Sequence, residues 1–81
     1  MIVRILYFAS LKDRTGISEE TIDVPETSDV GALWTALERR HAGLREVTTR
    51  PVAACDMVYA AWDCPLRGVV EIAFLPPVSG G

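Results

Sequence analysis

The residues best suited to chemistry are the last six of the chain, Pro76-Pro77-Val78-Ser79-Gly80-Gly81. Gly80 and Gly81 have no side chains, so their backbone fits a channel too narrow for any other residue. Such a tail presents a terminal carboxylate, which has a pKa of about 3.5 and is ionised at neutral pH. Because a carboxylate is a poor electrophile, acyl chemistry at Gly81 requires activation, for example adenylation by ATP. The competing interpretation is a frayed tail or an expression scar.

The other reactive residue types do not form a recognisable site. His41 is the only histidine and follows an expected helix, where it would stabilise the helix dipole rather than bind a metal. Cys55 and Cys64 lack the C-x-x-C spacing of zinc or redox sites and are interpreted as reduced, buried thiols. Asp56 and Asp63 fit turn positions. We therefore expect no metal site and no catalytic side chain outside the tail.

The elements that must position the tail are strands and one helix. A helix of about three turns is expected to begin near Thr27 or Ser28, which are good N-cap residues, and to end near Gly43 as the C′ residue. Residues 10–18 are expected to form a loop. The apolar stripe of the helix is Val30, Leu33, Trp34 and Leu37. Strands are expected at residues 2–8, 19–24, 51–55, 57–60 and 69–75.

This order of elements predicts an α+β fold of the β-grasp, or ubiquitin-like, type. A mixed sheet of about five strands, with one main helix packed across one face, buries both the helix stripe and the strands. Residues 1–75 form the expected β-grasp domain. Residues 76–81 form the expected flexible C-terminal tail that ends in Gly-Gly.

Size and charge exclude several classes of protein. A chain of 81 residues has room for one core, and a hydrophobic content of 49% is too high for a disordered chain. A net charge of −3 argues against binding nucleic acid. The apolar run at residues 1–9 is interrupted by Arg4, so we expect a strand rather than a signal sequence and no membrane partner. With two cysteines expected to be reduced, a cytoplasmic location is predicted.

The alternation of side chains along the strands predicts an apolar outer face on the sheet. Arg4 and Glu71 should face water, and side chains two residues apart share a face. Phe8 therefore shares the face of Arg4, and Leu75 shares that of Glu71, with Tyr59 as a further candidate. Such a cluster predicts a protein interface, although scattered exposed apolar residues are also common. The residues expected to face the helix are Val3, Ile5, Tyr7, Ile72 and Phe74.

Three segments carry a resemblance to a known family: Ile5–Ala9, with sequence ILYFA; Asp63–Leu66, with sequence DCPL; and Glu71–Gly81. Together they resemble the small subunit of molybdopterin synthase, the ubiquitin-like sulfur carrier of molybdenum-cofactor biosynthesis. The resemblance covers the whole chain. A terminal Gly-Gly is shared with thiamine-pathway sulfur carriers and with ubiquitin-like proteins generally, whereas Pro-Pro-Val-Ser-Gly-Gly points to the molybdopterin branch.

The resemblance implies a function for the tail. An adenylating and sulfurating enzyme would use ATP to activate Gly81 and convert it to a thiocarboxylate. The tail would then enter the large subunit, where its sulfur is transferred to cyclic pyranopterin monophosphate. The catalytic side chains would belong to the large subunit, in an assembly of two small and two large subunits. No cofactor would be bound stably, and ATP would be used by the adenylating partner. The residues implied to bind partners are Phe8, Tyr59, Leu75, Pro76, Pro77, Val78, Ser79, Gly80 and Gly81.

The sequence departs from the family pattern at two turns. Cys55-Asp56 stands where the family usually has Val-Asn, and Gly68-Val69-Val70-Glu71 stands where it usually has Asp-Gly-Asp-Glu. We therefore expect a loop of different shape before the last strand. Three alternatives remain open at this point: a thiamine-pathway sulfur carrier, a non-covalent β-grasp adaptor, and a small thiol enzyme that uses Cys55 or Cys64.

Overall fold

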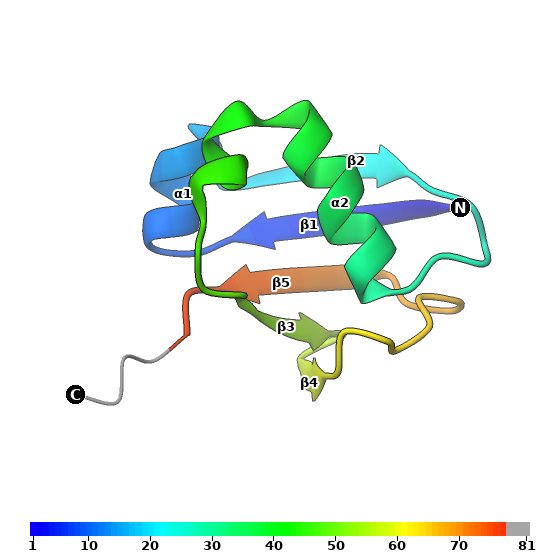
Figure 1. Cartoon of the computed structure of the whole chain (residues 1–81). Coiled ribbons are helices and arrows are strands. Elements are labelled where there is room, and N and C mark those ends of the chain that lie inside the picture. The colour runs from blue at the N-terminus through cyan, green and yellow to red at the C-terminus, as the bar shows by residue number, and fades with distance from the viewer. Residues whose placement is uncertain (78–81) are drawn as a thin grey trace.

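The computed structural model of the chain describes residues 1–77, and the predicted tail residues Val78, Ser79, Gly80 and Gly81 lie outside the described part. Its elements are β1 (Ile2–Tyr7), α1 (Ser10–Thr15), β2 (Glu19–Asp23), α2 (Val30–Arg40), η1 (Ala42–Glu46), β3 (Val52–Cys55), β4 (Val58–Ala60) and β5 (Glu71–Leu75) (Figure 1). In residues 1–77, no helix has the length and apolar character needed to span a membrane.

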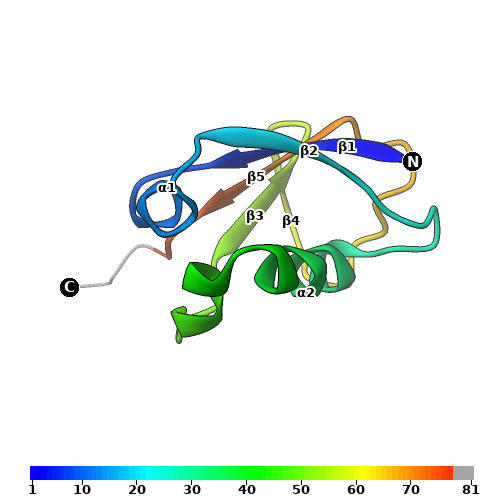
Figure 2. The same cartoon turned by 90° about the horizontal axis from the view of Figure 1, so that it is seen from above.

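The five strands form one mixed sheet in the order β2-β1-β5-β3-β4. β1 and β5 lie side by side in the sheet and run parallel, with Ile5 opposite Ile72 and Tyr7 opposite Phe74. The other neighbouring strands are antiparallel. Figure 2 shows α2 packed along one face of this sheet. The predicted β-grasp architecture is therefore confirmed, and the chain leaves the sheet from the strand next to β1.

The core lies between α2 and the inner face of the sheet. As the alternation predicted, the inner-face side chains of β1 and β5 are at most 2% exposed, and the four residues of the helix stripe are buried with them. Each fully buried side chain of this size contributes roughly 1.5–3 kcal/mol to folding. Ala53 and Cys55 extend the inner face onto β3.

The caps of α2 differ from those predicted. Asp29, rather than Thr27 or Ser28, is the N-cap residue, and its Oδ1 accepts a hydrogen bond of 2.8 Å from the backbone N–H of Ala32. Ser28 is buried instead, and its carbonyl accepts a hydrogen bond from the N–H of Leu66. The helix ends at His41, so Gly43 is not its C′ residue. The capping pattern allowed several residues, and contacts with a distant loop selected among them.

Gly43 lies instead in η1, which packs against α1. A Cβ atom at Gly43 would lie 2.3 Å from the carbonyl oxygen of Arg14 and clash with it. Residues 10–15 form α1 rather than the expected loop, with Leu11 buried beneath the helix. Gly16 ends α1 with φ of +78°, a conformation that favours glycine. One apolar residue in six was too weak a pattern to predict this helix.

The loop before β5, where the sequence departs from the family pattern, is hydrogen-bonded to Asp56. β5 begins at Glu71, two residues later than predicted. The carboxylate of Asp56 explains this boundary, because its Oδ1 accepts hydrogen bonds from the N–H groups of Val70 and Glu71 at 3.2 and 3.0 Å. Asp56 therefore joins the β3–β4 turn to the loop that enters β5. In the same loop, Gly68 has φ of +83°, a left-handed conformation that favours glycine.

Candidate functional site

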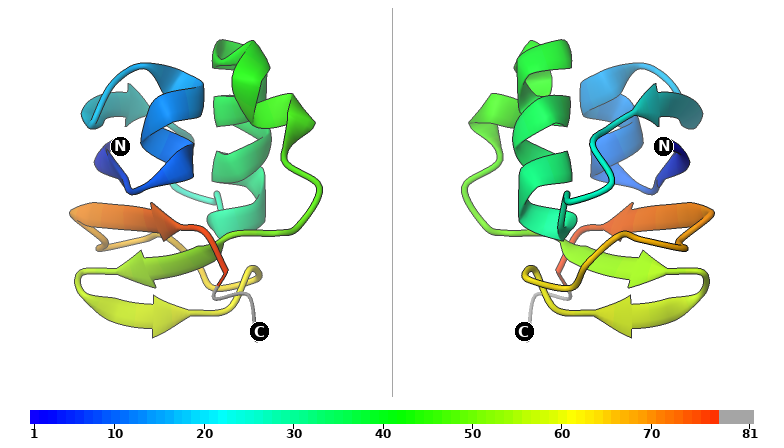
Figure 3. Two further views of the ribbon diagram at one scale, coloured as in Figure 1. Left: turned by 90° about the vertical axis from the view of Figure 1, so that its left-hand side faces the viewer. Right: turned by 90° about the vertical axis from the view of Figure 1, so that its right-hand side faces the viewer.

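The root of the tail is Pro76-Pro77, which follows β5 directly. Leu75 still pairs with Val52 of β3. Proline has no backbone N–H to donate, so the ladder of β5 is not continued. The chain leaves the sheet at the end of the molecule where α1 lies, as Figure 3 (left) shows. The predicted reactive residue, Gly81, and its neighbours Val78, Ser79 and Gly80 lie beyond residue 77, outside the described residues.

An apolar groove lies beside the tail root on the outer face of the sheet. It has a volume of about 470 Å³, and its lining residues are Val52, Tyr59, Leu75, Pro76 and Pro77. Tyr59 is 76% exposed and stands opposite Ala54, which in turn stands opposite Ala73 of β5. We call this hollow the apolar groove.

The structure separates one of the predicted interface residues from the others. Tyr59 and Leu75 meet in the apolar groove together with Pro76 and Pro77. Phe8 is 45% exposed but lines a second hollow with residues of β1, α1 and the start of β2. The parity of the strands placed Phe8 and Leu75 on one face. It did not show that Phe8 follows the end of β1, where the chain turns into α1.

A polar hollow lies on the other side of the tail root. It has a volume of about 170 Å³, and its lining includes Ser10, Arg14, Thr48, Thr49, Pro76 and Pro77. Nη1 of Arg14 lies 3.3 Å from the carbonyl oxygen of Gly43 and 3.6 Å from Oε2 of Glu46. Pro76 and Pro77 therefore form the wall shared by an apolar groove and a polar hollow.

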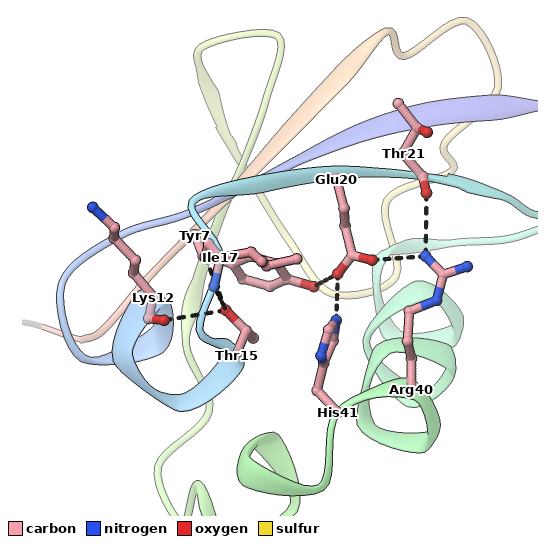
Figure 4. Close-up of polar contacts among 8 residues, drawn as sticks. All are labelled: Tyr7, Lys12, Thr15, Ile17, Glu20, Thr21, Arg40 and His41. Atoms are coloured by element: carbon pink, nitrogen blue, oxygen red, sulfur yellow. Dashed lines mark hydrogen bonds and ion pairs between the residues drawn. The ribbon is translucent and has the colours of Figure 1, made fainter.

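A polar cluster that the sequence analysis did not identify joins the inner side of the sheet to the end of α2 (Figure 4). The Glu20 carboxylate accepts hydrogen bonds from the Tyr7 hydroxyl at 2.6 Å and from Nη1 of Arg40 at 2.7 Å. Its Oε2 also lies 2.5 Å from Nε2 of His41. His41 therefore contacts a carboxylate in addition to its predicted place at the helix end. Glu20 shares a face with the core residue Ile22, and this alternation was the signal that a partner was needed.

The electrostatics of this cluster favour a structural role. Burial raises the pKa of Glu20, but its hydrogen bonds to Tyr7, His41 and Arg40 outweigh that effect and the net pKa is lowered. Burial, together with the hydrogen bond to Glu20, raises the pKa of Tyr7, so its hydroxyl remains a donor. Since three partners occupy the carboxylate, the cluster links elements and is not open to a ligand.

Both cysteines are free thiols, but only Cys55 is buried as expected, whereas Cys64 is partly exposed. Cys55 is buried, and this burial raises its pKa to about 11. Its thiolate is therefore scarce at neutral pH. Within the described part of the chain, no group of three His, Cys, Asp or Glu residues is placed to hold a metal ion. The burial and raised pKa of Cys55 argue against this residue as the nucleophile of a small thiol enzyme.

Comparison with known proteins gives consistent similarities along the whole chain. The model of the ThiS family matches residues 5–81. The chain is 38% identical to the human "Molybdopterin synthase sulfur carrier subunit", over 98% of this chain and 93% of that protein. Its structure is similar to the "Putative molybdopterin converting factor, subunit 1" of Pyrococcus furiosus, with a TM-score of 0.83, 29% identity and coverage of 96% and 99% of the two chains.

A further solved structure resembles the fold. The "Protein-protein complex of subunit 1 and 2 of Molybdopterin-converting factor" from Helicobacter pylori contains a chain that matches with a TM-score of 0.66 and 24% identity. Each of the two chains is covered completely. At this identity the likeness shows a common fold.

Proposed function

Because the chain belongs to the ThiS family, we propose that it is the sulfur-carrier subunit of a molybdopterin synthase. In this proposal Gly81 ends the chain and its carboxylate is adenylated, converted to a thiocarboxylate, and used to donate sulfur to cyclic pyranopterin monophosphate. The observation that carries the proposal is the similarity to the human sulfur-carrier subunit along nearly the whole length of both proteins.

Adenylation of the terminal carboxylate provides the leaving group that sulfur transfer to Gly81 requires. Direct displacement at a carboxylate would expel an oxide ion, which is a very poor leaving group. Attack of the Gly81 carboxylate on the α-phosphate of ATP gives an acyl adenylate and pyrophosphate, and AMP then leaves when sulfur attacks the carbonyl carbon. The catalytic groups belong to the partners. In residues 1–77, Glu20 is occupied by three partners and Cys55 is protonated at neutral pH, which supports this division of labour.

The tail root supports the delivery of Gly81 into a partner. Residues 76–81 reach at most about 20 Å when extended, and the two prolines stiffen the start of this segment. The apolar groove beside Pro76-Pro77 fits a docking surface for the large subunit, with Tyr59 as an aromatic anchor. We propose an assembly of two small and two large subunits. We also propose that the carrier acts in the cytoplasm, where its thiols stay reduced.

The decisive experiment is intact-mass measurement after incubation with an adenylating enzyme, ATP and a sulfur source. The expected result is a mass increase equal to replacement of one oxygen by sulfur, located at Gly81. A chain from which Gly81 is deleted is the control and should not gain this mass. No gain in the wild-type chain, or a gain that survives the deletion, overturns the proposal.

The alternative functions lead to different results in this experiment and in a binding assay. A non-covalent β-grasp adaptor would bind its partners equally well after Gly81 is deleted and would show no mass change. A thiamine-pathway carrier would gain sulfur but would not form product with the large subunit and cyclic pyranopterin monophosphate. The sequence Pro-Pro-Val-Ser before the diglycine favours the molybdopterin branch.

A further inference from the structure

The two cysteines of the chain, which the proposed function does not use, lie against the same part of the core. Cys55 is the last residue of β3 and is buried on the inner face of the sheet, and Cys64 packs against the same core cluster from the loop after β4. Burial is the main cause of the raised pKa of Cys55, and Cys64 raises it further through its charge and a side-chain hydrogen bond. The fold therefore brings two free thiols together.

The path of the chain accounts for this proximity. Residues 56 and 57 connect β3 to β4, which runs antiparallel to it. The N–H of Cys64 then donates a hydrogen bond of 3.0 Å to the carbonyl oxygen of Ala61 and closes a turn. The carbonyl oxygen of Cys64 accepts a hydrogen bond of 3.1 Å from the N–H of Val30. This second bond holds Cys64 at the start of α2, on the side of the sheet that Cys55 faces.

We propose that Cys55 and Cys64 form a site of oxidative modification, at which a low-molecular-weight disulfide such as oxidised glutathione converts the two thiols to an intramolecular disulfide. The inference is independent of the proposed function, because it uses neither Gly81 nor a partner. The ring that the disulfide closes consists of residues 55–64 and includes Tyr59 of the apolar groove. Oxidation therefore ties the β3–β4 hairpin covalently to the loop at the start of α2.

The unequal exposure of the two thiols sets the order of the steps. Cys64 is partly exposed, so its thiolate attacks one sulfur of oxidised glutathione, forms a mixed disulfide and expels a glutathione thiolate. Cys55 then loses its proton and attacks Sγ of Cys64, which expels the second glutathione thiolate. The two protons lost by the cysteines end on these two thiolates, so the protein loses two electrons and oxidised glutathione gains them. The Cys55 thiolate is scarce, but its proximity to Cys64 gives it a high effective concentration.

The test is equilibration of the full chain in glutathione redox buffers, followed by alkylation and mass measurement. The wild-type chain should lose the mass of two hydrogen atoms, and cleavage before Asp56 and Asp63 should leave the Cys55 and Cys64 peptides joined. Cys55→Val is the matched variant, because valine is also apolar, and it should retain one glutathione on Cys64. A wild-type chain that retains glutathione as Cys55→Val does, forms linked dimers instead, or stays reduced in the buffer that modifies Cys55→Val would overturn the inference.

A second measurement separates the effect of the fold from the closeness of the two cysteines in the sequence. Cys55 and Cys64 are near enough along the chain to form a disulfide in the unfolded state as well. The ratio of disulfide to dithiol is therefore measured in the same buffers with and without urea. It should be at least about 10-fold higher in the folded chain, because folding holds the thiols together. An equal or lower ratio in the folded chain would show that the fold keeps them apart and would overturn the inference.

Discussion

Oε2 of Glu20 on β2 lies 2.5 Å from Nε2 of His41 at the end of α2. This contact fixes the point at which the chain leaves α2 and enters η1. Through η1 it also fixes Gly43, which packs against the backbone of Arg14 in α1. A polar contact between an edge strand and a helix end therefore helps to shape the hollow beside the tail root.

The ionised form of Glu20 should stabilise the fold in a pH-dependent manner. Because the pKa of Glu20 is lower in the folded chain, its contribution is complete above the unfolded-state value of about 4.3 and is lost as the pH falls through the folded value. We expect Glu20→Gln to lower the free energy of unfolding by roughly 1–3 kcal/mol at pH 7. The difference from wild type should narrow below pH of about 4, as measured by urea denaturation.

Glu19→Gln is the matched control for this prediction, because Glu19 is the exposed neighbour of Glu20 on β2. It should change the free energy of unfolding by less than about 0.5 kcal/mol at either pH. A gap between wild type and Glu20→Gln that does not change with pH would contradict a role for the charge.

Gly43 should not tolerate a side chain. Its Cβ would lie 2.3 Å from the carbonyl oxygen of Arg14, which is backbone and cannot rotate away. Gly43→Ala should therefore lower the free energy of unfolding by about 1–3 kcal/mol. Gly31→Ala in α2 is the control, because its Cβ would lie 3.4 Å from the Trp62 carbonyl oxygen, and alanine favours the helix by about 0.5–1 kcal/mol. Equal effects in thermal or urea unfolding would refute the close approach.

The apolar groove should contribute to binding of the large subunit. Tyr59→Glu and Leu75→Glu place a charge in the groove, and each should weaken binding at least about 10-fold in calorimetry. Phe8→Glu should have a smaller effect, because Phe8 lies in a different hollow. Val70→Glu is the control, since Val70 is 70% exposed and does not line the groove. Normal binding by both groove variants would show that the interface lies elsewhere.

The two cysteines should react at different rates in the native protein. Cys55 is buried and burial raises its pKa to about 11, so at pH 8 only about one thiol in a thousand is ionised. Cys64 is partly exposed. Iodoacetamide should therefore label Cys64 first, as read by peptide mass mapping, and both residues should react at similar rates in urea. Native labelling of Cys55 first would contradict its burial.

Much of the fold was determined by local patterns in the sequence. The alternation in residues 2–8 and 71–75 identified the inner face of the sheet, and the spacing of Val30, Leu33, Trp34 and Leu37 identified the buried side of α2. These predictions succeeded because side-chain direction within a strand or helix depends on neighbouring residues only. The Pro-Pro-Val-Ser-Gly-Gly segment likewise carried the functional hypothesis without any knowledge of the fold.

Tertiary structure decided the features that depend on residues far apart in the chain. The register of β3 with β4 and β5 places Tyr59 beside Leu75 in the apolar groove. Phe8 follows the end of β1 and lines a different hollow. The helix α1 and the role of Gly43 follow from the packing of α1 on η1. The partners of Glu20 come from β1 and the end of α2. The reason is physical: a sequence pattern shows which side chains must be buried or paired, but only the packing of distant segments determines with which partners.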